Sequence, residues 1–265
     1  MLTQPGNRKP DYGIDAPGVV RVLTLVGLLL AGLAAWLLIA LHLIWLAAWC
    51  IVWACVCLGE AVAMLWTSRV GKLWEIRRML DCLVLCGDEE VLDVGCGRGM
   101  LLIEAARRLR SGHATGIDVW SMRDQSGNSP LVTQENARLA GVAERISVVT
   151  ADARQLPFPS ERFDVVVSCL ALHNIHGQEE RHRALREMLR VLKPGGKIAV
   201  LDLAHVKEYA RDLQALGAGQ LVLGRPSWRV FPPLRMLLAR KLPAPASGEG
   251  EAAAAASEAQ GGALA

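Results

Sequence analysis

The sequence lacks the patterns that bring disulfide or metal chemistry to a protein. It holds seven cysteines, an odd number, and no two of them form a CxxC pair. No group of His, Cys, Asp and Glu has the arrangement of a metal site, so we expect no bound metal. Three of the seven cysteines lie in one apolar block. This usage excludes a disulfide framework and is typical of reduced, buried thiols in a protein that faces the cytosol.

An excess of charge of one sign is also lacking. The 29 Lys and Arg residues nearly balance the 26 Asp and Glu residues, which leaves a net charge of +3. Proteins that bind nucleic acid carry a basic stripe or cluster, and this sequence has none. We therefore expect no nucleic-acid partner, and nothing in the sequence points to a protein partner.

Charge of either sign is absent from one long stretch, Val22–Gly59, which has 38 residues. One membrane-spanning helix needs about 20 residues, so this length predicts a hairpin of two spans. We place the spans near Val19–Leu37 and Leu43–Ala63, with the turn around Ala40–His42. No Pro or Gly marks that turn, and a single long tilted helix is the alternative.

Basic residues flank the uncharged stretch on both sides, at Arg8, Lys9 and Arg21 before it and at Arg69, Lys72, Arg77 and Arg78 after it. Positive residues favour the cytoplasmic side of a membrane, and only an even number of spans puts both flanks there. The sequence therefore predicts a membrane protein with two helices in the bilayer, with the rest of the chain facing the cytoplasm and membrane lipid as a partner. His42 is expected at the far interface.

A helical pattern follows the second span. Apolar and long side chains recur at helical spacing at Val70, Leu73, Trp74, Arg77, Leu80 and Leu83. This helix could lie on the lipid surface, or it could be the first helix of a soluble domain and pack on its sheet. The sequence leaves both alternatives open.

From Glu89 onward, short β-branched runs alternate with helical stretches. Such alternation predicts an α/β fold with a Rossmann-like, doubly wound and mostly parallel sheet. The chain is accordingly divided into an N-terminal cytoplasmic arm (1–18), a transmembrane hairpin (19–68), a linker or interfacial helix (69–87), a soluble domain (88–242) and a low-complexity, disordered tail (243–265).

A glycine-rich loop follows the first strand of this pattern, in the segment VLDVGCGRG. Ligands of open parallel sheets bind at the carboxyl ends of the strands, and glycines there let the backbone approach a ligand closely. Met100 stands where the dinucleotide fingerprint has its third glycine, and Asp93 suits a cationic ligand better than a pyrophosphate. Both features disfavour a nicotinamide-dependent oxidoreductase. The second strand ends in Asp118, which is placed to accept hydrogen bonds from ribose hydroxyls.

At this point the sequence resembles the class I S-adenosylmethionine-dependent methyltransferases, over roughly 88–201. The resemblance rests on VLDVGCGRG, on GID at the end of the second strand, on TADARQLPF, on FDVVVSCLALHNI and on RVLKPGGKI. It implies the class I methyltransferase fold, S-adenosylmethionine as the cofactor and a small-molecule substrate. It is nearest to a prokaryotic, small-molecule type that carries an N-terminal membrane hairpin.

The resemblance also implies which residues contact the cofactor. Asp93 and Gly95 would lie near its methionine end, Asp118 would hold the ribose, and Asp152 would lie near the adenine amine. The complete expected set is Asp93, Gly95, Cys96, Gly97, Gly99, Asp118, Val119, Asp152, Ala153 and Ser168. Asp152 and Ser168 could instead merely cap a loop or a strand end.

A polar insert, VWSMRDQSGNSP, follows Asp118 and is longer than a usual connection of about 2–6 residues. Trp120 could stack on the adenine or shape the substrate entrance, and Asn128 with its polar neighbours could bind substrate or fold back on the cofactor. Ser129 is also expected to cap a helix that begins at Pro130.

The remaining substrate candidates lie beyond the fourth strand and are Cys169, His173 and His176. A base is needed only if the nucleophile must lose a proton, and His173 is the candidate for that catalytic role. The fourth-strand motif lacks the Asn/Asp-Pro-Pro-aromatic run of base-amino DNA methyltransferases, and no Pro-Cys pair suggests a cytosine-C5 enzyme.

These observations predict a membrane-anchored methyltransferase that acts on a small, hydrophobic, lipid-like or quinone-like acceptor. The alternative is a non-catalytic sensor or scaffold that binds S-adenosylmethionine at the membrane.

Overall fold

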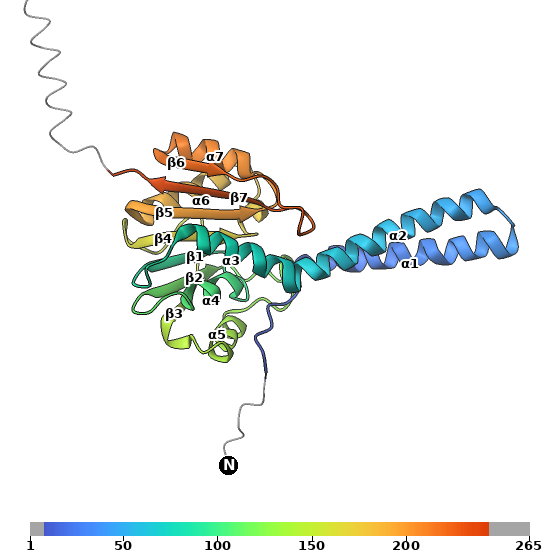
Figure 1. The fold of residues 1–265 in the computed structure, drawn as a ribbon, viewed down its shortest axis with the longest axis horizontal. Coiled ribbons are helices and arrows are strands. Elements are labelled where there is room, and N and C mark those ends of the chain that lie inside the picture. The colour runs from blue at the N-terminus through green and yellow to red at the C-terminus, as the bar shows by residue number, and fades with distance from the viewer. Residues whose placement is uncertain (1–7, 244–265) are drawn as a thin grey trace, which may run out of the picture.

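The computed structural model describes residues 8–243, and a seven-stranded sheet forms its centre. The strands are Glu90–Val94 (β1), His113–Asp118 (β2), Ile146–Thr150 (β3), Phe163–Cys169 (β4), Leu192–Asp202 (β5), Ala218–Leu223 (β6) and Arg235–Lys241 (β7). Their order is β3-β2-β1-β4-β5-β7-β6 (Figure 1). The first five strands in that order are parallel, and β7 runs antiparallel to β5 and β6. This order is the class I methyltransferase topology that the sequence predicts.

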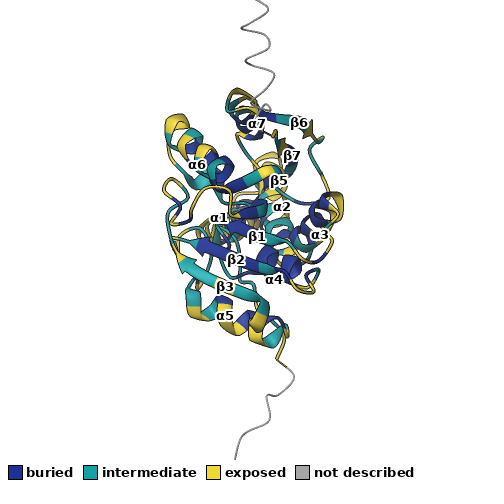
Figure 2. Cartoon of the chain, turned by 90° about the vertical axis from the view of Figure 1, so that its left-hand side faces the viewer, coloured by how far each residue is buried: buried dark blue, intermediate teal, exposed yellow. Residues whose placement is uncertain are grey.

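Helices cover both faces of the sheet. They are Lys72–Leu83 (α3), Met100–Ala106 (α4), Pro130–Leu139 (α5), Gln178–Val191 (α6) and Val206–Ala215 (α7). Side chains alternate along a strand, so Val91 belongs to one buried cluster with residues of α3 and α4, and Leu92 to a second cluster with residues of α6 and α7. Figure 2 shows α3 and α6 on opposite sides of the sheet. The two-sided cover explains why the strands are apolar throughout.

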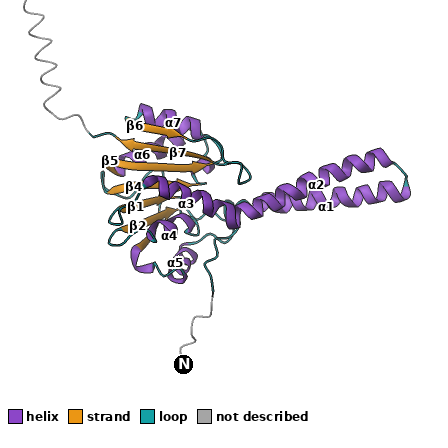
Figure 3. Cartoon of the chain, in the orientation of Figure 1, coloured by secondary structure: helices purple, strands orange, loops and turns teal. Residues whose placement is uncertain are grey.

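Two apolar helices, Pro17–Ala40 (α1) and Ile44–Trp66 (α2), form a hairpin that projects away from the sheet (Figures 1 and 3). The structure therefore contains two helices and not a single long one. Both are long and apolar enough to cross a membrane, judged by length and composition, and the 24 residues of α1 extend about 36 Å. Small residues lie at their contact, and large apolar side chains face outward, as in helix pairs packed within lipid.

The second hairpin helix continues without a break into the domain. A π-helical turn at Thr67–Gly71 (η1) joins α2 to α3, so that Ile44–Leu83 is one helix of 40 residues. Ile76, Met79 and Leu80 of α3 are buried in the core. Of the two alternatives for this segment, the structure shows packing on the sheet.

The residues that recur at helical spacing in the sequence only partly coincide with the buried face of this helix. Trp74 and Arg77 are exposed, whereas Lys72 and Glu75 are buried. The buried charges have partners, Asp15 for Lys72 and Arg78 together with Ser227 for Glu75, and pairing is what makes their burial possible. Residues 1–7 and 244–265, which include nearly all of the expected tail, lie outside the described residues.

Candidate active site

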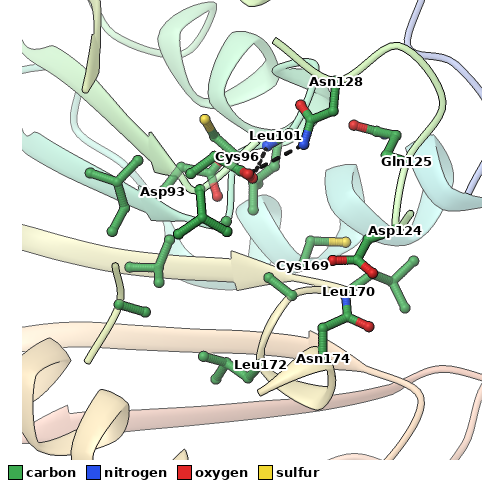
Figure 4. Close-up of a pocket in the computed structure, with 18 of the residues that line it drawn as sticks. Asp93, Cys96, Leu101, Asp124, Gln125, Asn128, Cys169, Leu170, Leu172 and Asn174 are labelled. Atoms are coloured by element: carbon green, nitrogen blue, oxygen red, sulfur yellow. Dashed lines mark hydrogen bonds between the residues drawn. The ribbon is translucent and has the colours of Figure 1, made fainter. Parts of the chain in front are cut away.

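A cavity of about 350 Å³ lies where β1, β2 and β4 end. The glycine-rich loop after β1 forms one wall, the polar insert after β2 a second, and the segment after β4 a third. In Figure 4, Asp124, Gln125 and Asn128 of the insert lie along one side of the cavity, and Leu172 and Asn174 lie across from them. The position agrees with the rule that open parallel sheets bind ligands at the carboxyl ends of their strands.

The structure brings most of the predicted site residues to this one cavity. Those on its wall are Asp93, Gly95, Cys96, Gly97, Asp118, Val119, Asn128, Asp152, Ala153, Cys169 and His176. Those that are not on its wall are Gly99, Trp120, Ser168 and His173.

The glycine-rich loop makes its turn with a backbone that favours glycine. Gly95 has φ 77°, and a Cβ added there would overlap the Cβ of Ala171 in the segment after β4. The backbone N–H groups of Gly95 and Cys96 both donate to the carbonyl oxygen of Ile117, at 2.9 Å. The absence of a side chain at Gly95 therefore lets the glycine-rich loop approach the segment after β4 at the floor of the cavity.

Asp93, the last acidic residue before this loop, is completely buried. Neither of its carboxylate oxygens has hydrogen-bond geometry with a described residue, although the backbone N–H of Leu102 lies near enough to offset a small part of the effect of burial on the pKa of Asp93. Burial, with a smaller contribution from the negative charge of Asp118, raises the pKa of Asp93 to about 8. A cationic ligand in the cavity would supply the opposite charge that this carboxylate lacks.

Asp118 holds the glycine-rich loop and the insert together. One of its oxygens accepts from the N–H of Gly97 at 2.8 Å, and the other from the N–H of Trp120 at 2.6 Å and from Asn128 Nδ2 at 3.2 Å. Ionised carboxylates accept about four hydrogen bonds, so Asp118 retains capacity for a ligand hydroxyl. The arrangement suits the ribose role that the resemblance implies.

Two thiols lie on the cavity wall, Cys96 buried and Cys169 partly buried. Burial raises the pKa of Cys96 and of Cys169 above the ordinary value for a thiol. A thiol is a nucleophile only as the thiolate, so neither cysteine is poised to act as one at neutral pH. Both side chains therefore help to shape the cavity wall and do not act as nucleophiles.

Asp152 forms an ion pair with the guanidinium group of Arg154. Its carboxylate accepts from Arg154, with 2.5 Å between Asp152 Oδ2 and Arg154 Nη2, and this contact lowers the pKa of Asp152. Arg154 also contacts Glu180 at 2.8 Å. Asp152 therefore stays ionised at the cavity edge as a hydrogen-bond acceptor.

The predicted residues that do not line the cavity have structural contacts instead. Ser168 is buried and donates to the carbonyl oxygen of Val94 at 2.8 Å, which ties β4 to β1. Trp120 turns its indole N–H to Thr150 Oγ1 at 2.8 Å. Gly99 is the N-cap of α4, with φ 86°. As expected, Ser129 caps α5 and accepts from the N–H of Val132 at 3.3 Å.

The two histidines after β4 have different surroundings. His173 Nδ1 lies 2.6 Å from Asp202 Oδ1, and the buried Asp202 also accepts from the backbone N–H of His173 at 3.1 Å. These contacts hold His173 against the end of β5, away from the cavity wall. His176 is exposed and lines the cavity. The catalytic role of His173 thus stays a prediction, without direct access to the cavity in this structure.

Sequence reasoning missed the contribution of the N-terminal arm and of α3. Asp15, Lys72 and Ile76 all line the cavity, and Lys72 Nζ lies 2.6 Å from Asp15 Oδ2. The arm is bound to the domain by several contacts, including Arg98 to Asp11 at 2.9 Å. One sequence signal could have indicated this wall: Lys72 and Ile76 are four residues apart and so share one face of the predicted helix. The charge of Lys72, however, suggested that this side chain is exposed to solvent.

Comparison with known proteins agrees with this geometry. Residues 92–200 match the family model described as "Methyltransferase domain". The ubiquinone/menaquinone biosynthesis C-methyltransferase UbiE of Vibrio vulnificus is 33% identical over 142 residues, which are 53% of this chain and 50% of the relative. UbiE of Roseobacter denitrificans is 31% identical over 137 residues, 52% of this chain and 51% of the relative. The chain thus spans about half the length of these curated relatives.

Solved structures share the fold. The [4+2]-cyclase SpnF has a TM-score of 0.57 at 22% identity, over 67% of this chain and 84% of that one. A geranyl diphosphate methyltransferase in complex with S-adenosylmethionine has a TM-score of 0.56 at 14% identity, over 69% of this chain and 90% of that one.

Proposed function

Because residues 92–200 belong to the class I S-adenosylmethionine-dependent methyltransferases, we propose that this chain transfers a methyl group to a small, lipid-soluble acceptor similar to a quinone precursor. The cofactor is S-adenosylmethionine. The acceptor class is suggested by the relatives, whose names describe C-methylation in quinone biosynthesis.

The observation that carries the acceptor class is the position of the cavity at the base of the apolar hairpin. Asp15 lies two residues before α1, and Lys72 directly follows the π-helical turn that ends α2. Both line the cavity. An acceptor dissolved in a bilayer crossed by the hairpin would therefore meet the cavity where the hairpin joins the domain. Anchoring in this way confines the search for substrate to the membrane surface.

The residues of the cavity fit the cofactor. S-Adenosylmethionine carries positive charge on sulfur and on its amino group, and Asp93 is a buried carboxylate without a partner among the described residues. Asp118 has capacity for ribose hydroxyls at the end of β2, where such a carboxylate is needed. The turn at Gly95 leaves backbone, and no side chain, at the cavity floor.

When bound, the cofactor supplies an electrophilic methyl group whose carbon–sulfur bond breaks as the new bond to the acceptor forms, with the electron pair left on sulfur. The protein holds the two reactants together, and such positioning accounts for much of the rate of a bimolecular displacement. Leu170, Leu172 and Ile175 give the wall opposite the insert an apolar surface, which excludes water from the reacting atoms.

The proposal is tested with the full chain reconstituted in lipid vesicles. The vesicles are incubated with S-adenosylmethionine that carries a deuterated methyl group and with an apolar extract of bacterial membranes. Mass spectrometry should find the label in a lipid-soluble product, and the variant Asp93→Asn should form much less of it. Label confined to water-soluble products would contradict the acceptor class.

A non-catalytic binder of S-adenosylmethionine at the membrane is the second candidate. It stays open because a shared fold does not by itself establish methyl transfer: SpnF has this fold and is named a cyclase, not a methyltransferase. Tight binding of the cofactor with no label transfer to any fraction would favour this candidate.

A further inference from the structure

Lys72 and Asp15 form an ion pair on the cavity wall that the proposed function does not yet use. Lys72 Nζ lies 2.8 Å from Oδ1 and 2.6 Å from Oδ2 of Asp15. The side chain of Lys72 is only 6% exposed, and that of Asp15 is 25% exposed. Neither residue belongs to the glycine-rich loop or to the strand ends that hold the cofactor in this fold.

Several contacts keep the pair in place. The backbone N–H of Asp15 donates to Ser68 Oγ at 3.1 Å, and Gln125 Nε2 donates to Asp15 Oδ1 at 3.3 Å. Lys72 begins α3 directly after the π-helical turn, and π-helical turns often occur at functional sites. The pair is thus held jointly by the arm, by the insert and by the helix that leaves the hairpin.

The ammonium of Lys72 has an unused donor. An ammonium has three N–H groups, and Asp15 is its only hydrogen-bond partner among the described residues. Arg154 is the other Lys or Arg on the cavity wall, and it is held by Asp152 and Glu180. Lys72 is therefore the cation on the described wall that can bind an anionic oxygen.

The pair also lies close to the reacting centre. Cys169 lies at the end of β4 (Figure 4). Burial is the main cause of its raised pKa, and the charges of Lys72, Asp15 and Asp93 make smaller contributions to that pKa. Lys72, Asp93 and Cys169 all lie on the wall of the same cavity. The subsite that Lys72 defines is on the hairpin side of the cavity floor.

We propose that Lys72 binds a hydroxyl or phenolate oxygen of the acceptor's head group, and that Asp15 holds the ammonium ready for it. The assignment rests on the proposed function, and it narrows the acceptor to a hydroxylated aromatic, quinol-type lipid. The oxygen lies at Lys72, the ring extends over the cavity floor beside Cys169, and the apolar tail leaves along the hairpin. An ammonium there favours ionisation of the hydroxyl, whose proton goes to solvent, and the ring carbon of a phenolate is a better nucleophile than that of a phenol. After methyl transfer, the proton on the methylated ring carbon also leaves to solvent, which restores the aromatic ring.

The test uses the full chain in lipid nanodiscs and a prenylated hydroquinone with one free ring carbon as the probe. Binding of the probe is measured directly, by quenching of tryptophan fluorescence, and methyl transfer is measured separately. Lys72→Met should weaken binding of the probe about tenfold to a hundredfold, as expected for the loss of a hydrogen bond to a charged group. Its affinity for S-adenosylmethionine should change less than about twofold.

Two further variants separate binding from a structural role. Lys72→Arg should recover much of the lost affinity. Asp15→Asn keeps an acceptor oxygen beside the ammonium but removes the charge that holds it, so it should weaken binding of the probe much less than Lys72→Met does. A merely structural pair predicts that Lys72→Met and Asp15→Asn are equally harmful. The control is Lys193→Met, because Lys193 also forms an ion pair, with Asp164 at 2.8 Å, but this pair is more exposed and is not on the cavity wall. It should behave as the wild type.

The outcomes distinguish this inference from the proposed function. Binding of the hydroquinone that depends on Lys72 supports the subsite even if no methyl transfer follows, in which case the proposed function fails alone. Methyl transfer to other lipids, without binding of the hydroquinone by the wild-type chain, overturns the subsite alone. Equal binding by the wild type and by Lys72→Met also overturns it.

Discussion

Asp93 is completely buried, and no positive charge of the described residues offsets its own. Its pKa is raised to about 8, so in the free protein at pH 7 the carboxyl group is mostly protonated. A cationic ligand favours the ionised form. Binding of S-adenosylmethionine at pH 7 should therefore release a proton from Asp93, and the release should vanish well above pH 8, where the group is already ionised.

The proton release can be measured by isothermal titration calorimetry in two buffers that differ in ionisation enthalpy. At pH 7, the wild type should release up to about one proton more than Asp93→Asn, because the variant has no carboxyl group to ionise. The variant should also bind S-adenosylmethionine at least about tenfold more weakly. Equal proton release by both proteins would contradict the prediction, because Asp93 would then have the same protonation state in the free and the bound protein.

The histidines after β4 give a second prediction at this scale. A general base contributes about 10²- to 10⁴-fold to rate, and His173 is held by Asp202 away from the cavity wall. We expect His173→Gln to lower kcat less than tenfold and to lower the unfolding temperature, because Asp202 is then buried with one partner fewer. His176→Gln, on the cavity wall, is the matched variant and should act mainly on KM for the acceptor. A hundredfold fall in kcat for His173→Gln, with loss of the acidic limb of the pH profile, would establish the base.

Individual residues were predictable where a local motif specified them. Asp93 and Asp118 follow from strand-end positions next to the glycines, and the structure places both on one wall. Lys72 and Asp15 were not predictable, because their pairing joins segments 57 residues apart in the chain. Nothing local in the sequence shows that a lysine is buried when its partner is that distant.

At the scale of elements, alternation of short β-branched runs with helical stretches predicted the strands and helices of the domain. The buried parallel strands are apolar on both faces, so each appears in the sequence as a short continuous apolar run that can be recognised without an alignment. The position of α3 was left open by the sequence, because a helix that packs on a sheet and one that lies on lipid have the same periodicity. The contacts of Ile76, Met79 and Leu80 with the core decide it.

The glycine-rich loop gives a prediction for an element. Gly95→Ala adds a methyl group that overlaps Ala171, at a φ of 77° that disfavours side chains. Gly141→Ala is the matched control, since Gly141 has φ 72° but no atom within 4 Å of the added methyl group. Both variants should lose about 1–2 kcal/mol of stability from the backbone.

Gly95→Ala should lose about 1–3 kcal/mol more from overpacking, and should also bind S-adenosylmethionine more weakly because the segment after β4 must shift. Thermal unfolding in detergent and calorimetric titration measure the two effects. Equal affinity for the cofactor in both variants would show that the close approach at Gly95 does not shape the binding site.

At the scale of the whole molecule, both ends of the hairpin are fixed to the same domain. Before α1, the N–H of Ala16 donates to the carbonyl oxygen of Asp124 at 3.0 Å, and Asp15 pairs with Lys72. After α2, the chain continues as one helix into α3. If the hairpin crosses a bilayer, the arm and the domain must therefore lie on the same side. From the sequence, the basic residues that flank the hairpin were the one basis for expecting the arm and the domain on the same side. These residues favour the cytoplasmic side.

The topology can be tested with a membrane-impermeant maleimide, because Cys82 and Cys86 of the domain are exposed. In inverted inner-membrane vesicles, whose cytoplasmic face points outward, these two cysteines should be labelled. A cysteine placed at the hairpin tip by His42→Cys, in a background of Cys82→Ser and Cys86→Ser, should be labelled only in vesicles of the opposite orientation. The background without the tip cysteine is the control for the native thiols that remain. Labelling of domain and tip from the same side would show that the hairpin does not span the bilayer, and the bilayer route to the cavity would then have no basis.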